Sequence, residues 1–168
     1  MEQGYDARAI ANLFLTWARE DKKSKSYTPM KIIKLVYIAH GWCLALLDKP
    51  LILEPVEAWR YGPVIRILYD TFKQFGNEPI QGLAEYNEVE SKSGPVEEQI
   101  KEDCIEIIYS VYHSYGDFGA FQLANLTHRP ASPWEKAIGA SRTSIPNDII
   151  KTEYERIRDR NQEQAQAS

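Results

Sequence analysis

The spacing of apolar residues near the start of the chain predicts an amphipathic helix that ends near Glu20. Asp6 precedes it and belongs to the residue types that cap a helix by accepting a hydrogen bond from a free backbone N–H. The apolar positions follow the i, i+3, i+4, i+7 spacing of one buried face: Ile10, Leu13, Phe14 and Trp17. We therefore expect one side of this helix to pack against a core, with a solvated loop after it.

A second helix is predicted from Thr28-Pro29 to about Leu47. Thr28 can cap its N-terminus, and proline is tolerated at the first helical position because its missing N–H would have no partner there. Apolar residues surround this helix instead of forming a stripe, so we expect an enclosed central helix. Lys31, Lys34 and His40 interrupt the apolar run, and the remaining pieces are too short to cross a membrane.

The middle of the chain predicts extended structure and then a third helix. Residues 51–61 contain two prolines and several β-favouring residues, so they should hold at most one short strand. Gly62-Pro63 is expected to turn the chain directly into a helix that Gly76 ends. Residues 77–94 carry scattered glycine, proline and asparagine and predict a long loop.

Helical patterns return in the C-terminal half of the chain. One helix is expected from Pro95 to Gly116, and a short one over residues 118–126. Ser132 and Asn147 are predicted to cap two further helices.

Together these elements predict a mainly α fold in a single domain over residues 1–160. We expect a compact bundle of about six helices, with at most one short extended or β segment near residues 51–61. The polar residues 161–168 are expected to fray.

The charge of the chain is concentrated in one segment. The 168 residues hold 20 Lys and Arg against 24 Asp and Glu, a net charge of −4. Residues 85–103 alone contain seven acids and two lysines, so the rest of the chain is close to neutral. This balance makes nucleic acid an unlikely partner. An autoregulator that binds DNA stays a weaker alternative, because residues 19–34 hold six basic residues against two acids.

Sequence signals for catalysis, metal binding and secretion are missing. Cys43 and Cys104 lack the spacing of a metal or redox motif, and the N-terminus lacks the basic and apolar regions of a secretion signal. These features predict a cytoplasmic protein with reduced thiols. None of the common zinc, phosphate-loop, nucleophile-elbow or dinucleotide motifs occurs. We therefore expect no enzyme activity, no metal and no cofactor.

Two lysines on the apolar second helix are the most informative charges. Lys31 and Lys34 lie three residues apart, and lysine is rarely buried without a partner. Either this side of the helix faces solvent, or the amines pair with carboxylates such as Glu54 or Glu57, or they belong to a recognition surface. His40 on the same helix is better explained as a hydrogen-bonded core residue.

Trp59, Arg60 and Tyr61 form the densest group of residue types that dominate binding energy at protein interfaces. The alternative is that the two aromatic side chains fill the core while Arg60 faces outward. A second candidate contact is the loop with His128 and Arg129, which a plain connection between helices explains equally well.

Four separated blocks of the chain resemble the Panacea domain, a family that includes SocA-like and GepA-like phage-associated antitoxins. The blocks keep a fixed order within residues 5–138: Tyr5-Asp6-Ala7 with Ile10-Ala11-Asn12; Thr28-Pro29-Met30-Lys31 with Lys34-Leu35, Tyr37 and Ala39-His40-Gly41; Glu57-Ala58-Trp59-Arg60-Tyr61-Gly62-Pro63-Val64; and Leu126-Thr127-His128 with Ser132-Pro133-Trp134. Ile33 and the acidic segment depart from the family pattern, which leaves the identity of the partner open.

This resemblance implies an antitoxin that binds and neutralises a toxin encoded beside it. The residues expected to bind that partner are Trp59, Arg60, Tyr61, Lys31, Lys34, His128 and Arg129. Glu97, Glu98 and Glu102 are expected to steer a basic toxin by charge complementarity. Two alternatives stay open: an adaptor that delivers the toxin to a AAA+ protease such as ClpXP, and an enzyme that reverses a toxin's modification of its target.

Overall fold

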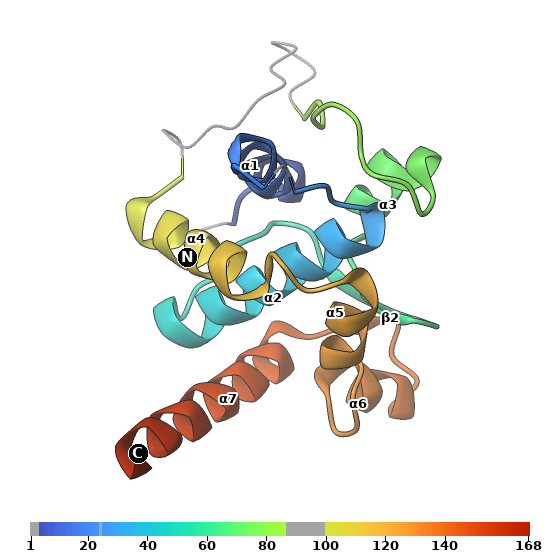
Figure 1. The fold of residues 1–168 in the computed structure, drawn as a ribbon. Coiled ribbons are helices and arrows are strands. Elements are labelled where there is room, and N and C mark those ends of the chain that lie inside the picture. The colour runs from blue at the N-terminus through green and yellow to red at the C-terminus, as the bar shows by residue number, and fades with distance from the viewer. Residues whose placement is uncertain (1–3, 24, 87–99) are drawn as a thin grey trace.

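The computed structural model describes residues 4–23, 25–86 and 100–168 and folds them around one buried helix (Figure 1). Its α-helices are α1 (Ala7–Glu20), α2 (Pro29–Leu47), α3 (Arg66–Phe72), α4 (Glu102–Tyr115), α5 (Ala120–Thr127), α6 (Pro133–Gly139) and α7 (Asn147–Ala167). A 3-10 turn, η1 (Lys73–Phe75), extends α3, and the strands are β1 (Val56–Trp59), β2 (Gly62–Val64) and β3 (Ser144–Ile145). The mainly α class is confirmed, with seven α-helices in the described ranges where about six were expected.

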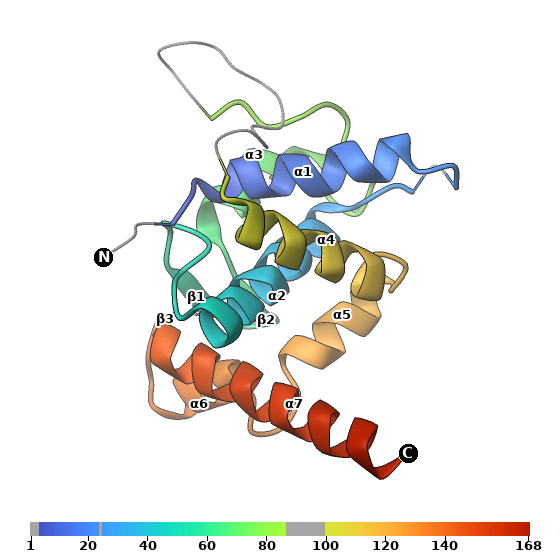
Figure 2. The same cartoon turned by 90° about the vertical axis from the view of Figure 1, so that its left-hand side faces the viewer.

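Helix α2 is the centre of the fold. Helices α1 and α4 pack on one side of it, α7 packs on the opposite side, and α5, α3 and β2 also contact it (Figures 1 and 2). Of its 19 residues, 14 are buried, which confirms the prediction of an enclosed central helix. Burial on all sides explains why its apolar residues form no stripe.

The length and composition of α2 would also suit a membrane span, and α2 alone does so among the residues that the structure covers. Its mean hydropathy is 1.5, but 72% of it is buried inside the protein. The core helix of a globular domain gives the same pattern, so the hydropathy of α2 is explained by its packing.

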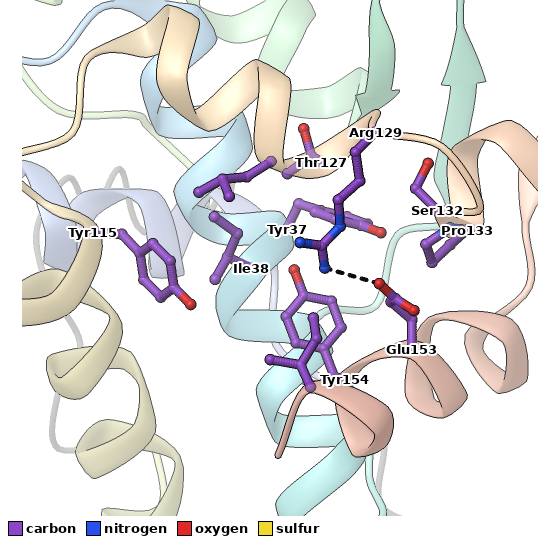
Figure 3. A pocket seen from close by; sticks show the side chains of 11 residues that line it. Tyr37, Ile38, Tyr115, Thr127, Arg129, Ser132, Pro133, Glu153 and Tyr154 are labelled. Carbon is purple, nitrogen blue, oxygen red and sulfur yellow. Dashed lines mark hydrogen bonds and ion pairs between the residues drawn. The ribbon is translucent and has the colours of Figure 1, made fainter. Parts of the chain in front are cut away.

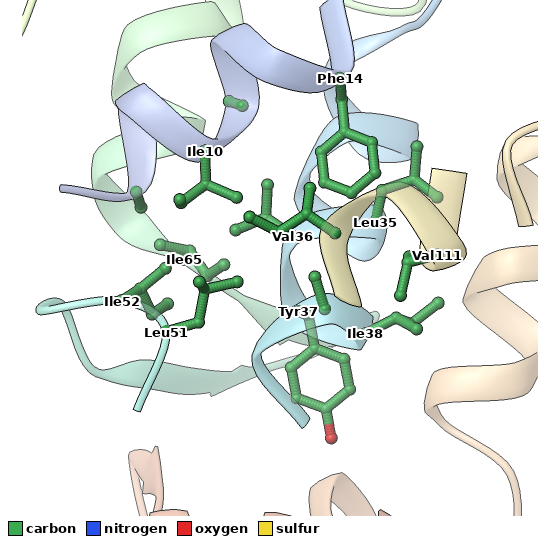
Figure 4. Packing of buried hydrophobic residues seen from close by; sticks show 14 of the residues in the cluster. Ile10, Phe14, Leu35, Val36, Tyr37, Ile38, Leu51, Ile52, Ile65 and Val111 are labelled. Atoms are coloured by element: carbon green, nitrogen blue, oxygen red, sulfur yellow. The ribbon is translucent and has the colours of Figure 1, made fainter. Parts of the chain in front are cut away.

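The hydrophobic core joins segments that are far apart in the sequence. Ile10 and Phe14 reach down from α1, Val111 comes from α4, and Leu51 and Ile52 follow the end of α2 (Figure 4). Between them the residues of α2 point outward in all directions (Figure 4). Burial of this apolar surface is the main contribution to the stability of the fold.

Three of the four predicted helix caps are confirmed. The Asp6 side chain accepts from the backbone N–H of Arg8, Thr28 accepts from Lys31, and Ser132 accepts from Glu135. The prediction that Asn147 caps α7 is wrong, because Pro146 occupies the cap position without a side-chain bond. The Asn147 side chain instead lies 3.0 Å from a ring nitrogen of the buried His40.

The prediction of at most one short strand was wrong. β1 pairs antiparallel with β2, with Trp59 opposite Gly62, and with β3, with Val56 opposite Ile145. Gly62-Pro63 therefore starts a strand instead of turning directly into α3, which begins only at Arg66. β3 was missed because a two-residue strand gives no alternation to detect.

The ends of two helices differ from their predicted bounds. Lys101 has extended backbone angles, so α4 begins at Glu102 and not at Pro95, which lies outside the described ranges. Residues 161–168, expected to fray, are exposed and continue α7 as far as Ala167. Their fraying in solution and the domain bounds 1–160 stay predictions.

Candidate partner-binding groove

A groove of about 520 Å³ opens between the N-terminal half of α2, the β1–β2 turn and the α3–η1 segment. We call it the α2–β2 groove. It contains four of the predicted partner-binding residues, namely Lys34, Trp59, Arg60 and Tyr61. The other lining residues are Pro29, Met30, Ile33, Val64, Tyr69, Lys73, Gly76 and Asn77. Four residues that the sequence singled out therefore lie on one connected surface, and their part in partner binding stays a prediction.

The aromatic wall of the groove is held in place by two neighbouring side chains. The Trp59 ring meets the Tyr69 ring edge to face at 4.8 Å, and the Arg66 guanidinium lies over the Trp59 ring at 5.0 Å. Arg66 is in turn fixed by two hydrogen bonds to Glu57 on β1. The Trp134 indole N–H of α6 donates to the Trp59 carbonyl oxygen at 2.6 Å.

The tip of the β1–β2 turn presents a large aromatic side chain to solvent. Tyr61 is 70% exposed, and Arg60 stacks over its ring at 5.3 Å. Met30 and Tyr69, on the facing walls of the groove, are also exposed. The alternative that both aromatic residues fill the core is therefore wrong for Tyr61, while Trp59 is half-buried.

Lys34 lies at the base of the groove and is only 3% exposed. Its Nζ donates to the Pro63 carbonyl oxygen at 2.9 Å, and burial lowers the pKa of Lys34 to about 8. The alternative that it pairs with Glu54 or Glu57 is wrong. Glu54 accepts from the Ala7 backbone N–H, and Glu57 binds Arg66.

Gly62 makes the approach of Lys34 to the backbone possible. Its φ of 117° is a conformation that residues with a Cβ rarely adopt. A Cβ built at this position would lie 2.7 Å from Lys34 Nζ. The glycine between Tyr61 and Pro63 therefore leaves room for a buried ammonium at the base of the groove.

Two other basic residues of the 19–34 region, Lys31 and Lys25, have partners within the protein, whereas Lys22 and Lys23 are exposed. Lys31 does not line the groove; its amine lies 4.5 Å from the centre of the Tyr27 ring, and burial lowers its pKa. Lys25 pairs with Asp21 and Asp117. These partners weaken the case for nucleic-acid binding through this region.

His128 and Arg129 do not line the groove, and their part in partner binding stays a prediction. The His128 ring packs edge to face on Trp134 at 5.0 Å and bonds to the Ala124 carbonyl oxygen. Arg129 points into a different, smaller cavity of about 90 Å³ between α2, α5 and α7 (Figure 3). There it pairs with Glu153 of α7 at 2.9 Å (Figure 3).

The small cavity is built from matched polar groups and two buried tyrosines. Burial would raise the pKa of Glu153, but hydrogen bonds from Arg156 and Arg129 outweigh it and lower that pKa. The Tyr37 hydroxyl is buried without a protein partner.

The acids expected to steer a toxin are only partly described. Glu97 and Glu98 lie outside the described residues. Glu102 is exposed in the first turn of α4, where a negative charge interacts favourably with the helix dipole. Its neighbour Asp103 is bound to Lys49 at 2.9 Å. Electrostatic steering by these acids stays a prediction.

His40 and the two cysteines, the other residues with possible catalytic or metal-binding side chains, are part of the core. His40 accepts from the Leu51 backbone N–H and lies beside Asn147, and burial lowers its pKa to about 4, so it is the hydrogen-bonded core residue predicted. Cys43 and Cys104 are buried and unbridged. Within the described ranges, no three His, Cys, Asp or Glu side chains gather as metal ligands.

Sequence reasoning missed the part of the groove that α3 supplies. Tyr69 and Lys73 gave no signal, because their positions on a short helix look like an ordinary solvent-facing side. Met30 and Ile33 also line the groove and were not among the predicted partner-binding residues. A detectable hint was the number of aromatic residues on both sides of the Gly62-Pro63 pair.

The fold and the groove fit a small helical domain with a surface for a partner, and comparison with known proteins gives its family. Residues 32–135 match the family described as antitoxin SocA-like, Panacea domain. The chain is 30% identical over 151 residues to antitoxin SocA of Caulobacter vibrioides (strain NA1000 / CB15N), covering 85% of this chain and 76% of that protein. The chain therefore belongs to the SocA-like Panacea family, as its four sequence blocks indicated. No solved structure matches it.

Proposed function

We propose that this protein is a cytoplasmic antitoxin that neutralises its cognate toxin by binding it directly through the α2–β2 groove. Membership of the SocA-like family supports the antitoxin role. The observation that carries the proposed surface is the exposed Arg60–Tyr61 tip beside an apolar groove of about 520 Å³. Tyrosine, tryptophan and arginine are the residue types that contribute most to binding energy at interfaces.

The position of the groove suits recognition of a protein. Its walls come from three rigid elements, so little conformational entropy is lost when a partner orders them. Its lining is mainly apolar, with Arg60 and Lys73 at the edges for orientation. An apolar centre with a polar rim is the usual anatomy of a protein interface.

The test is co-expression with the small protein encoded by the neighbouring reading frame. Growth arrest by the neighbour should be rescued by the wild-type protein, and the purified pair should bind at a ratio close to one to one. Tyr61→Ala should weaken binding by about thirtyfold, because loss of an interface hot spot costs about 2 kcal/mol. The fold should survive, since this side chain is 70% exposed.

Phe121→Ala is the matched control. Phe121 is 78% exposed on α5 and does not line the groove. Its removal should change affinity and rescue by less than twofold. Equal losses for both variants would contradict the proposed surface, and a neighbour that is harmless or does not bind would contradict direct neutralisation.

The same experiment separates the two alternatives. An adaptor for a AAA+ protease would make the toxin disappear faster, whereas sequestration leaves its amount steady. An enzyme that reverses a modification would rescue growth far below one to one. No feature of the described residues favours either alternative over direct binding.

A further inference from the structure

Lys34 is an unusual component of a binding groove, because its ammonium is buried without an opposite charge. An ammonium can donate three hydrogen bonds, and the structure gives Lys34 Nζ one, to the neutral Pro63 carbonyl oxygen. Burial is the sole cause of its lowered pKa, so no nearby carboxylate compensates the charge. A buried charge with one neutral partner is costly for the folded protein.

The other charges around the groove also leave Lys34 without an opposite charge. Its lining contains three basic residues, Lys34, Arg60 and Lys73, and no aspartate or glutamate among the residues described. Lys73 is paired with Asp70 outside the lining, and Arg60 stacks on Tyr61. Lys34 is therefore the groove cation without a counter-charge or an aromatic face.

We propose that the toxin supplies the missing counter-charge: a glutamate or aspartate side chain, flanked by apolar residues, inserts into the α2–β2 groove and pairs with Lys34. This inference rests on the proposed function and names the chemistry of the partner at that site. The methylene groups of such a side chain contact the apolar walls while its carboxylate reaches the base. A charge-assisted bond in this dry position is stronger than one at the surface.

The arrangement provides specificity as well as affinity. A partner with a neutral side chain at this position would cover Lys34 completely and leave its charge without compensation. That cost rejects the wrong partner, while the apolar walls alone would accept many. Gly62 is required for this selectivity, because the side chain of any larger residue would displace Lys34 Nζ.

The first test needs no knowledge of the toxin. A displayed library of random dodecapeptides is selected on the full-length protein and, in parallel, on Lys34→Met, which keeps the aliphatic stem and removes the charge. The wild-type protein should enrich peptides with an acid between apolar residues, and Lys34→Met should lose that preference. Selection without acid enrichment, or the same enrichment on both proteins, would overturn the inference.

The second test uses the complex with the neighbouring gene product. Lys34→Met should lower its affinity at least tenfold while the protein becomes more stable, a combination that a merely structural lysine would not give. Lys151→Met, on α7 and away from the groove, should change affinity less than twofold. Unchanged affinity in Lys34→Met would overturn the inference even where Tyr61→Ala still abolishes binding, so the two proposals fail separately.

A carbodiimide that joins amines to adjacent carboxylates identifies the source of the charge. In the complex, Lys34 should be cross-linked to an aspartate or glutamate side chain of the toxin, as mapped by mass spectrometry. A cross-link to the C-terminal carboxylate of the toxin, or to an acid of this chain, would overturn the assignment.

Discussion

Two buried charges, Glu153 of α7 and Lys34 of α2, differ in how the protein compensates them. Glu153 is 6% exposed and accepts hydrogen bonds from Arg129 (Figure 3) and from Arg156, so its charge is compensated within the protein. Lys34 is 3% exposed and has one neutral acceptor. Both are buried to a similar extent, yet only the first is matched.

This difference distinguishes a charge that stabilises the fold from a charge that is available to a partner. A matched buried charge ties the segment that follows α5 to α7 and is not available to a partner. An unmatched one costs stability in the free protein and regains it when an opposite charge arrives. The matched site also lies in a cavity of about 90 Å³, whereas Lys34 lies at the base of a groove of about 520 Å³.

The largest expected effect comes from breaking the matched site. Glu153→Ala leaves two arginine side chains facing each other without their acid, so the free energy of unfolding should fall by about 3 kcal/mol. Chemical denaturation measures this change. Arg156→Met, which removes a more exposed partner, should cost below about 1 kcal/mol. Equal costs for the two variants would show that Glu153 is not the centre of the network.

Replacing Lys34, which has no opposite charge, should stabilise the protein instead of destabilising it. Lys34→Met should raise the free energy of unfolding by about 2 kcal/mol at neutral pH, because a buried charge is replaced by an apolar side chain of similar size. The lost hydrogen bond to Pro63 offsets part of the gain. Denaturation of both proteins in the same buffer gives the difference.

The pH dependence of that difference checks its cause. The pKa of Lys34 is about 8 in the folded protein and 10.5 in an ordinary environment. Between these values the unfolded chain binds more protons, so the stability of the wild-type protein rises with pH across this window. The advantage of Lys34→Met should therefore be complete below pH 8 and shrink toward pH 10.5. A constant difference would mean that the charge is not the cause.

The helices were predictable because local signals decide them. Asp6, Thr28 and Ser132 cap as their residue types predict, and the all-round apolar pattern of α2 identified the central helix. The small sheet was not predictable, since β3 has two residues and pairs with β1 over a separation of almost ninety residues. Asn147 was misassigned because a tertiary contact with His40 takes its side chain.

The candidate site also has one part that was predictable from the sequence and one part that was not. The Trp59-Arg60-Tyr61 group was visible because its residues are adjacent, and the structure places them in one groove. The absence of a carboxylate beside Lys34 could not be read from the sequence, where Glu54 and Glu57 looked like available partners. Their pairing with Ala7 and Arg66 is decided by three-dimensional packing.

The smallest expected effect tests whether α6, which follows the loop with His128 and Arg129, supports the groove through Trp134. Trp134→Phe removes the hydrogen bond to the Trp59 carbonyl oxygen and should cost about 1 kcal/mol of stability. Because that bond ties the end of β1 to α6, the affinity for the toxin should also fall, by about threefold, in a binding titration. His128→Ala removes the ring contact between His128 and Trp134 but keeps the hydrogen bond from Trp134 to Trp59. The affinity of this variant for the toxin should therefore stay within error of the wild type. A loss of stability in Trp134→Phe without any loss of affinity would mean that the groove keeps its shape without this tether, and that the segment between α5 and α6 is a structural connection alone.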